Sequence, residues 1–129
     1  YALYARYIRA RHHEGDMYPP SPRQYREFLT SDWADTLFVE FRHHERLVAL
    51  AVVDVLSTGW SAVYTFYDPD ETQRSLGTYV ILWQIQACRE RQLPYLYLGY
   101  WVRQAERMRY KTRFRPLELL IEGEWLLAR

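Results

Sequence analysis

The stretch QRSLGTYVILWQIQACRER, residues 73–91, decides the fold. Its apolar residues recur at the spacing of one helix face, which predicts a helix over residues 79–91. That apolar face consists of Val80, Ile81, Trp83, Ile85, Ala87 and Cys88. Leu93-Pro94 ends the helix, because a proline cannot continue it.

Strand patterns lie on both sides of this helix. Residues 47–53 form a continuous apolar run, which is typical of a strand buried on both faces. After an irregular or helical start at residues 1–15, the expected elements are a helix from Ser21-Pro22, strands at 36–41, 47–53 and 60–67, the helix at 79–91, a strand at 95–100, a basic helix around 103–110 and a last strand near 119–127. A meander followed by a crossover predicts a mixed sheet and an α+β fold.

The composition is that of one globular domain over residues 1–129, with 49% hydrophobic and 26% charged residues. No apolar run reaches the roughly 20 residues of a membrane span, and we expect no signal peptide. The single cysteine, Cys88, excludes a disulfide framework or a multi-cysteine metal site within this sequence and fits a cytoplasmic protein. Because the chain opens at Tyr1 without an initiator methionine, we expect it to be a fragment of a longer protein.

Charge is segregated along the chain, although the net charge is only +1. Residues 1–26 hold five arginines against two acids, and residues 103–115 hold six bases against one acid. Residues 27–71, in contrast, hold nine acids against two arginines. The two basic ends predict one anion-binding face if they meet in the fold, and ordinary solvated helix surfaces are the alternative.

The junction before the helix carries an Arg-x-x-Gly pattern, from Arg74 to Gly77. Backbone N–H groups at a helix start form a cradle for a phosphate or a carboxylate. In this order of elements, the junction resembles the acyl-donor loop R-x-x-G-x-G/A of the GNAT acyltransferase superfamily. Tyr79 stands where that loop has its second small residue, and it would crowd the pyrophosphate of coenzyme A.

Longer motifs carry a more specific resemblance. They are LYARYIRARHHEGDM (3–17), TLFVEFR (36–42), DVLSTGWSAVYTFYDP (54–69), RSLGTYVILWQI (74–85), PYLYLGYW (94–101) and ERMRYKTRFRP (106–116). In this order and spacing they resemble the aminoacyl-tRNA–protein transferases, and most of all the bacterial aspartate/glutamate leucyltransferase branch of the arginyltransferase family. Members of that family carry a further N-terminal domain with clustered cysteines, which is absent from this sequence.

The resemblance implies a GNAT-like domain that transfers an amino acid from charged tRNA to the N-terminal amine of a protein beginning with Asp or Glu. The product would be marked for degradation by the N-degron route. The expected partners are therefore aminoacyl-tRNA and such proteins, in the cytoplasm and without a membrane or a cofactor. Leucine is the expected donor amino acid. Arginine transfer, a coenzyme A-dependent N-acetyltransferase and a non-enzymatic RNA-binding module are the alternatives.

This implied function assigns roles to the basic side chains. A tRNA is a polyanion, so its donor face needs cations, while its terminal adenosine needs an aromatic ring to stack on. The candidate tRNA contacts are Arg6, Arg9, Arg11, Arg103, Arg107, Arg109, Lys111, Arg113 and Arg115. The acidic acceptor side chain needs a charged partner, for which Arg74 and Lys111 are the candidates.

For this reaction the enzyme must position the two substrates, keep the acceptor amine neutral and stabilise the tetrahedral oxyanion. No covalent enzyme intermediate is required. In GNAT-like folds, the acyl group enters where two parallel strands splay, here at 61–67 and 95–100. The candidates that donate to the leaving ribose oxygen or orient water are Tyr64, Tyr97, Tyr100 and Tyr110, each with core packing as the alternative. Asp54 either binds the amine or begins a turn.

For the remaining candidates, structural roles are expected rather than catalytic or metal-binding ones. His12 matches a position of the family motif, which favours a structural or site-lining hydrogen bond. Adjacent histidines at 12–13 and 43–44 point apart, so we expect no metal site. Cys88 lies on the apolar helix face, which favours packing over catalysis.

Overall fold

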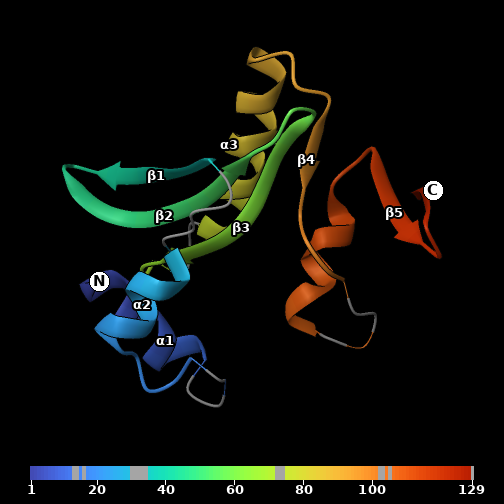
Figure 1. Ribbon diagram of the computed structural model, residues 1–129. Coiled ribbons are helices and arrows are strands. Elements are labelled where there is room, and N and C mark those ends of the chain that lie inside the picture. The colour runs from blue at the N-terminus through green and yellow to red at the C-terminus, as the bar shows by residue number, and fades with distance from the viewer. Residues whose placement is uncertain are drawn as a thin grey trace. The chain divides into compact units, whose positions relative to one another are not determined.

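In the computed structural model, the apolar run at residues 47–53 forms the centre of strand β2 (Arg46–Val55). Strand β2 pairs antiparallel with β1 (Asp35–His43) and with β3 (Gly59–Tyr67), and β3 pairs parallel with β4 (Tyr95–Tyr97). The strand order is β1-β2-β3-β4, a meander followed by a crossover (Figure 1). Helices with a mixed sheet confirm the predicted α+β class.

The structure describes residues 1–12, 15, 17–29, 35–71, 75–101, 104 and 106–128. The chain forms two units, residues 1–99 and residues 100–129. The first unit holds the sheet and three helices: α1 (Ala2–Arg11), α2 (Pro22–Leu29) and α3 (Leu76–Glu90). Among the described residues, no helix combines the length and the apolarity needed to cross a bilayer.

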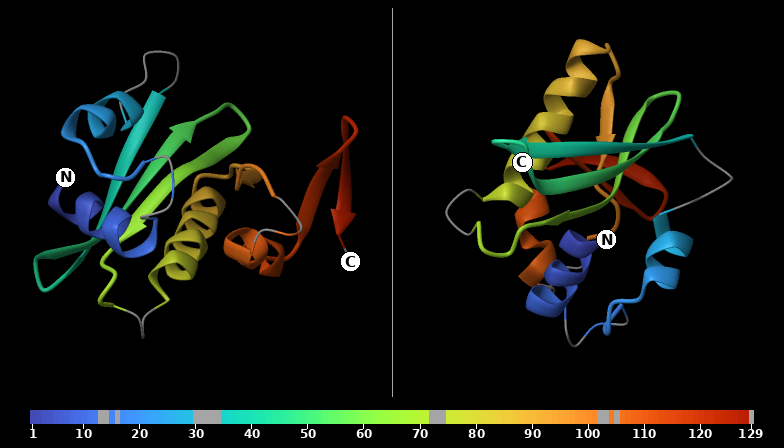
Figure 2. Two further views of the ribbon diagram at one scale, coloured as in Figure 1. Left: turned by 90° about the horizontal axis from the view of Figure 1, so that it is seen from below. Right: turned by 90° about the vertical axis from the view of Figure 1, so that its left-hand side faces the viewer.

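Helices cover both faces of the sheet, which is why residues 47–53 of β2 are all apolar (Figure 2). On one face, α3 packs against Ala51, Val53 and Trp60. On the other face, α1 packs with Leu50 and Phe66. These faces are called the α3 face and the α1 face below. The prediction that residues 47–53 form a strand buried on both sides is confirmed.

A bulge in β3 decides which side chains reach the α1 face. Val52 is opposite Tyr64, but the next residue, Val53, is opposite Ala62, so Val63 is an extra residue. Since strand side chains alternate, one inserted residue reverses the alternation beyond it. Trp60 therefore points to the α3 face, whereas Tyr64 points to the α1 face.

The helix boundaries differ slightly from those predicted. Helix α3 begins at Leu76 rather than at residue 79, so Gly77 lies in its first turn and not in a preceding loop. The N-cap of α3 is Ser75, with a left-handed φ of 46°. Helix α2 begins as predicted, because the backbone N–H of Gln24 donates to Oγ of Ser21 at 3.4 Å.

The second unit contains the 3-10 helix η2 (Glu106–Arg113) and a hairpin of β5 (Leu117–Ile121) and β6 (Glu124–Ala128). The prediction of one strand near residues 119–127 is therefore wrong. Glu122 and Gly123 both have positive φ values, 50° and 83°, and turn the chain back on itself. A two-residue turn of this kind favours glycine. The sequence analysis did not identify the turn, because apolar residues on both sides of it resemble one continuous strand.

The strand predicted at 95–100 ends at Tyr97, and its pairing with β3 depends on Gly59. A Cβ built on Gly59 would lie 1.9 Å from the carbonyl oxygen of Tyr95. No side chain fits that gap, so the two strands approach this closely only with glycine at position 59.

We predict that Gly59→Ala lowers the free energy of unfolding by about 2 kcal/mol or more, because the β4 backbone must move. Gly77→Ala is the matched control, since a Cβ there meets only Tyr67 Cε1 at 3.6 Å. Chemical denaturation of both variants measures the difference. Equal stabilities would contradict the close approach of β3 and β4.

Candidate active site

A row of polar residues crosses all four strands. In the strand register, Thr36 is opposite Asp54, Asp54 is opposite Ser61, and Ser61 is opposite Tyr97. Directly opposed residues point to the same face of a sheet. Because Val53 and Trp60 face α3, this polar row lies on the α1 face.

Asp54 is the charged member of the polar row. Its side chain is only 7% exposed, and Oδ1 accepts a hydrogen bond from Thr36 Oγ1 at 2.8 Å. None of the ion pairs among the described residues includes Asp54. Asp54 lies inside β2, one residue before its end, rather than in the turn that follows.

Tyr97 ends the polar row where β3 and β4 part. The paired residues of β4 end at Tyr97, opposite Ser61, while β3 continues to Tyr67. The Tyr97 hydroxyl and Thr58 Oγ1 are 2.9 Å apart, so they share a hydrogen bond. This bond fixes the Tyr97 hydroxyl beside Thr58, the residue before β3 begins.

Tyr64 belongs to an aromatic cluster on the same face. Its ring meets that of Tyr7 edge-on, with centroids 6.3 Å apart, and the Tyr7 hydroxyl lies 3.1 Å from His12 Nε2. Burial, with the neighbouring phenols of Tyr7 and Tyr4, raises the pKa of Tyr64 well above its usual value. Tyr64 thus stays protonated at neutral pH, but its hydroxyl is buried away from solvent.

The structure therefore brings together the predicted site residues Asp54, Tyr64 and Tyr97 on one face of one sheet. His12 shares a hydrogen bond with Tyr7, which in turn contacts Tyr64, and its role in a site stays a prediction. Sequence reasoning missed Tyr7. Its signal was the helical spacing of Tyr4, Tyr7 and Ile8, all buried on α1.

A buried carboxylate after β3 is a second feature that sequence reasoning missed. Asp68 is 1% exposed and accepts hydrogen bonds from Arg6 at 2.9 Å, Arg46 at 2.5 Å and the Asp70 N–H at 2.9 Å. Burial opposes its ionisation, but these hydrogen bonds and the arginine charges outweigh burial and lower the pKa of Asp68. Arg46 also binds Glu71, so this network holds the start of the segment that leads to α3.

The predicted tRNA contacts of the first unit occupy different surroundings. Arg6 forms ion pairs with Asp68 and Asp70, so its charge is already paired within the protein. Arg9 and Arg11 are exposed in the last turn of α1, and the Arg11 guanidinium lies 5.4 Å from the centroid of the Tyr67 ring. Within this unit, Arg9 and Arg11 are the more accessible cations for a phosphate.

The second unit holds the other predicted basic residues. Lys111 Nζ donates to the carbonyl oxygen of Tyr100 at 2.8 Å, and burial lowers the pKa of Lys111. Tyr100 itself is 90% exposed, and Tyr110 is half-buried. Arg109 and Arg113 are exposed along η2, whereas Arg115 donates to the carbonyls of Thr112 and Phe114.

Three predicted contacts lie outside the described residues: Arg74, Arg103 and the side chain of Arg107. Gly77 is described and lies in the first turn of α3, near the Tyr67 ring. The role of the Arg74 to Gly77 cradle therefore stays a prediction.

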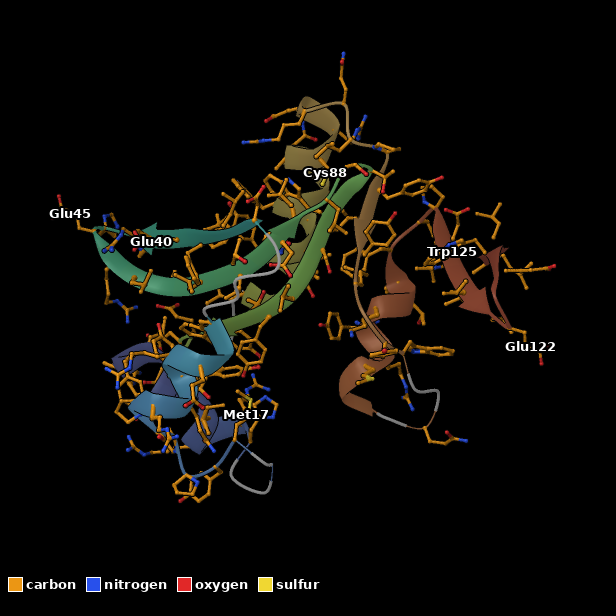
Figure 3. All side chains as sticks on the ribbon, in the orientation of Figure 1. Met17, Glu40, Glu45, Cys88, Glu122 and Trp125 are labelled. Atoms are coloured by element: carbon orange, nitrogen blue, oxygen red, sulfur yellow. The ribbon has the colours of Figure 1, made fainter. Side chains whose placement is uncertain are left out.

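Cys88 packs in the core between α3 and the sheet (Figure 3). Burial raises the pKa of the Cys88 thiol, and this effect outweighs the opposing effects of the Trp60 backbone and of Arg91. A buried thiol with a raised pKa is poorly reactive, which is consistent with packing. In the described part of the chain, no three His, Cys, Asp or Glu side chains come together as metal ligands.

This chain is similar to known transferases over almost its whole length. Residues 1–121 match the family described as "Arginine-tRNA-protein transferase, C terminus". An aspartate/glutamate leucyltransferase of Hahella chejuensis is 54% identical over 126 residues, 98% of this chain and 54% of the relative. The enzymes of the same name from Alcanivorax borkumensis and Pseudomonas aeruginosa are each 56% identical, covering 97% and 98% of this chain and 52% and 54% of the relatives. The chain thus spans about half the length of these relatives.

The Asp68 network gives a prediction for stability. We expect Asp68→Asn to lower the free energy of unfolding at pH 7 by about 2 kcal/mol, because two arginines lose a buried charged partner. A carboxyl whose pKa is lowered by folding stabilises the protein above its unfolded pKa of about 3.9 and loses that effect as the pH falls through the folded value. The deficit of the variant should therefore shrink below about pH 4.

Denaturation curves from pH 7 to pH 2.5 measure this deficit. Asp70→Asn is the matched control, since Asp70 binds Arg6 but is 84% exposed and should contribute less than 1 kcal/mol. A deficit that is the same at every pH would contradict an ionised Asp68.

Proposed function

Because this chain belongs to the arginine-tRNA–protein transferase C-terminal family, we propose that the protein moves leucine from aminoacyl-tRNA to the N-terminal amine of proteins that begin with Asp or Glu. The observation that carries this proposal is the identity of about 55% to aspartate/glutamate leucyltransferases across nearly the whole chain. The reaction takes place in the cytoplasm, and its product is a substrate for N-degron degradation.

The reaction forms one bond and breaks another. The neutral acceptor amine attacks the carbonyl carbon of the aminoacyl ester, and a tetrahedral oxyanion forms. The bond from this carbon to the ribose oxygen then breaks, an amide remains, and the proton lost by the amine is returned to the ribose hydroxyl. The ester is already activated, so the protein needs to orient the two substrates and to stabilise charge.

The α1 face of the sheet supplies groups for these tasks. Ser61 and Tyr97 are the last paired residues of β3 and β4, and an acyl group enters a GNAT-like fold where two such strands part. We assign Tyr97 rather than Tyr64 as the donor to the leaving oxygen, because the Tyr64 hydroxyl is buried. The ring of Tyr64 packs against Tyr7, and Tyr7 shares a hydrogen bond with His12, so these three side chains hold the α1 face of the site in place.

The exposed cations provide the contacts for the donor tRNA. Arg109 and Arg113 follow one 3-10 helix, and phosphates bind such side chains with little sequence preference. Arg74 or Lys111 binds the acidic side chain of the acceptor. A cation beside the acceptor amine also lowers the pKa of that amine, which favours its neutral, attacking form.

The proposal is tested by incubating the full-length protein with labelled leucyl-tRNA and peptides that begin with Asp, Glu or Ala. We expect leucine to appear at the N-terminus of the Asp and Glu peptides, at a kcat/KM on the order of 10²-fold above that of the Ala peptide. Arginyl-tRNA, acetyl-coenzyme A and deacylated tRNA serve as the other donors or ligands.

Each alternative has its own signature in this assay. Transfer from arginyl-tRNA but not from leucyl-tRNA would assign arginine as the donor, and acetylated peptides would assign a coenzyme A-dependent enzyme. Binding of deacylated tRNA without any modified peptide would leave a non-enzymatic RNA-binding module and overturn the proposal.

A further inference from the structure

The carboxyl group of Asp54 is buried, and its described contacts include no cation. It is 93% shielded from solvent, and its described hydrogen-bond donor is the uncharged hydroxyl of Thr36. A buried ion without an opposite charge is costly, and such groups are normally paired or bind a cation. Asp54 also lies in mid-row, directly opposite Ser61, which carries a hydroxyl group. The surroundings of Asp54 thus suit a small cation with several N–H donors.

We propose that Asp54 binds the α-ammonium group of the aminoacyl donor, and this inference rests on the proposed function. Two amines meet in the reaction, and they need opposite surroundings. The acceptor amine must be neutral to attack, and a carboxylate beside it would raise its pKa and hold it protonated. The donor amine does not react, so it can stay protonated and bind the protein through its positive charge. A carboxylate therefore suits the donor amine and disfavours the acceptor amine.

The neighbouring row on the same face supplies the surface for the side chain of the donor. Phe38, Val52 and Tyr64 are opposite one another in the strand register. They lie two residues from the polar row along β1 and β2, and three along β3, where Val63 is inserted. Two residues along a strand span roughly 6.6 Å, which is close to the reach of a leucine from its ammonium to its methyl groups. Phe38 is 50% exposed, so its ring is available for contact. An apolar row at this distance from Asp54 suits leucine better than arginine.

The test compares two donors that differ only in the ammonium. Leucyl-tRNA is deaminated to the tRNA ester of the corresponding α-hydroxy acid, and kcat/KM for an Asp-starting peptide is measured with both donors. We expect the full-length wild type to favour leucyl-tRNA by on the order of 10²-fold, and we expect Asp54→Asn to reduce that preference to a few-fold. The KM for the peptide should stay unchanged. Asp35→Asn is the matched control, because Asp35 is an exposed carboxylate at the start of β1.

Direct binding separates this inference from the proposed function. Leucinamide carries the ammonium but needs no tRNA, and its binding is followed by NMR in the wild type, in Asp54→Asn and in Thr36→Val. Binding that is lost in Asp54→Asn and kept in Thr36→Val supports the ammonium site, including when the transfer assay fails. If leucine transfer proceeds and Asp54→Asn keeps the wild-type donor preference, or slows both donors equally, the inference is wrong while the proposed function stands.

A separate pair of variants tests whether the Phe38 row contacts the side chain of the donor amino acid. Phe38→Ala should lower kcat/KM for leucyl-tRNA about 10-fold, because it removes apolar contact area. Leu37→Ala is its control, since Leu37 is a similarly exposed neighbour opposite Val53, a residue of the α3 face. An equal loss in both variants would overturn the assignment of the Phe38 row to the donor side chain.

Discussion

The parallel pairing of β3 with β4 extends over only three residues, and the arrangement of the site depends on it. Gly59 allows the two backbones to approach, Ser61 and Tyr97 end the pairing, and β3 then continues without its partner. The polar row therefore reaches the point where the strands part, since Ser61 and Tyr97 are its members on β3 and β4. A longer pairing would have bonded the next part of the β3 backbone to β4.

The bulge at Val63 complements this short pairing. It turns Tyr64 and Phe66 towards α1, where they meet Tyr4 and Tyr7 and build an aromatic layer. Aromatic rings packed edge-on form a rigid support with few rotatable bonds. The polar row lies on the same face as this layer, so Asp54 is held by a packed framework and not by a flexible loop.

Much of the fold follows from sequence patterns, because burial imposes them. The apolar run of β2 and the apolar face of α3 are direct consequences of helices covering both sides of the sheet. The hairpin of β5 and β6 escaped the sequence analysis because its turn is only Glu122-Gly123, within an apolar stretch. For the site, motif resemblance singled out Asp54, Tyr64 and Tyr97 as candidates. Their common face depends on strand register and on a one-residue bulge, which no local pattern reports. The contacts of Tyr7 with Tyr64 and of Asp68 with Arg6 join residues far apart in the chain, so the sequence alone could not show them.

A crystal structure of the full-length protein with 3′-leucylamino-3′-deoxyadenosine, a stable amide analogue of the donor end, tests the account most directly. The account predicts the ligand on the α1 face, its ammonium at ~2.8 Å from a carboxylate oxygen of Asp54 and its leucine side chain against Phe38. The carbonyl oxygen should lie beside Ser61 or Tyr97. A ligand bound with its ammonium away from Asp54, or on the α3 side of the sheet, would contradict it.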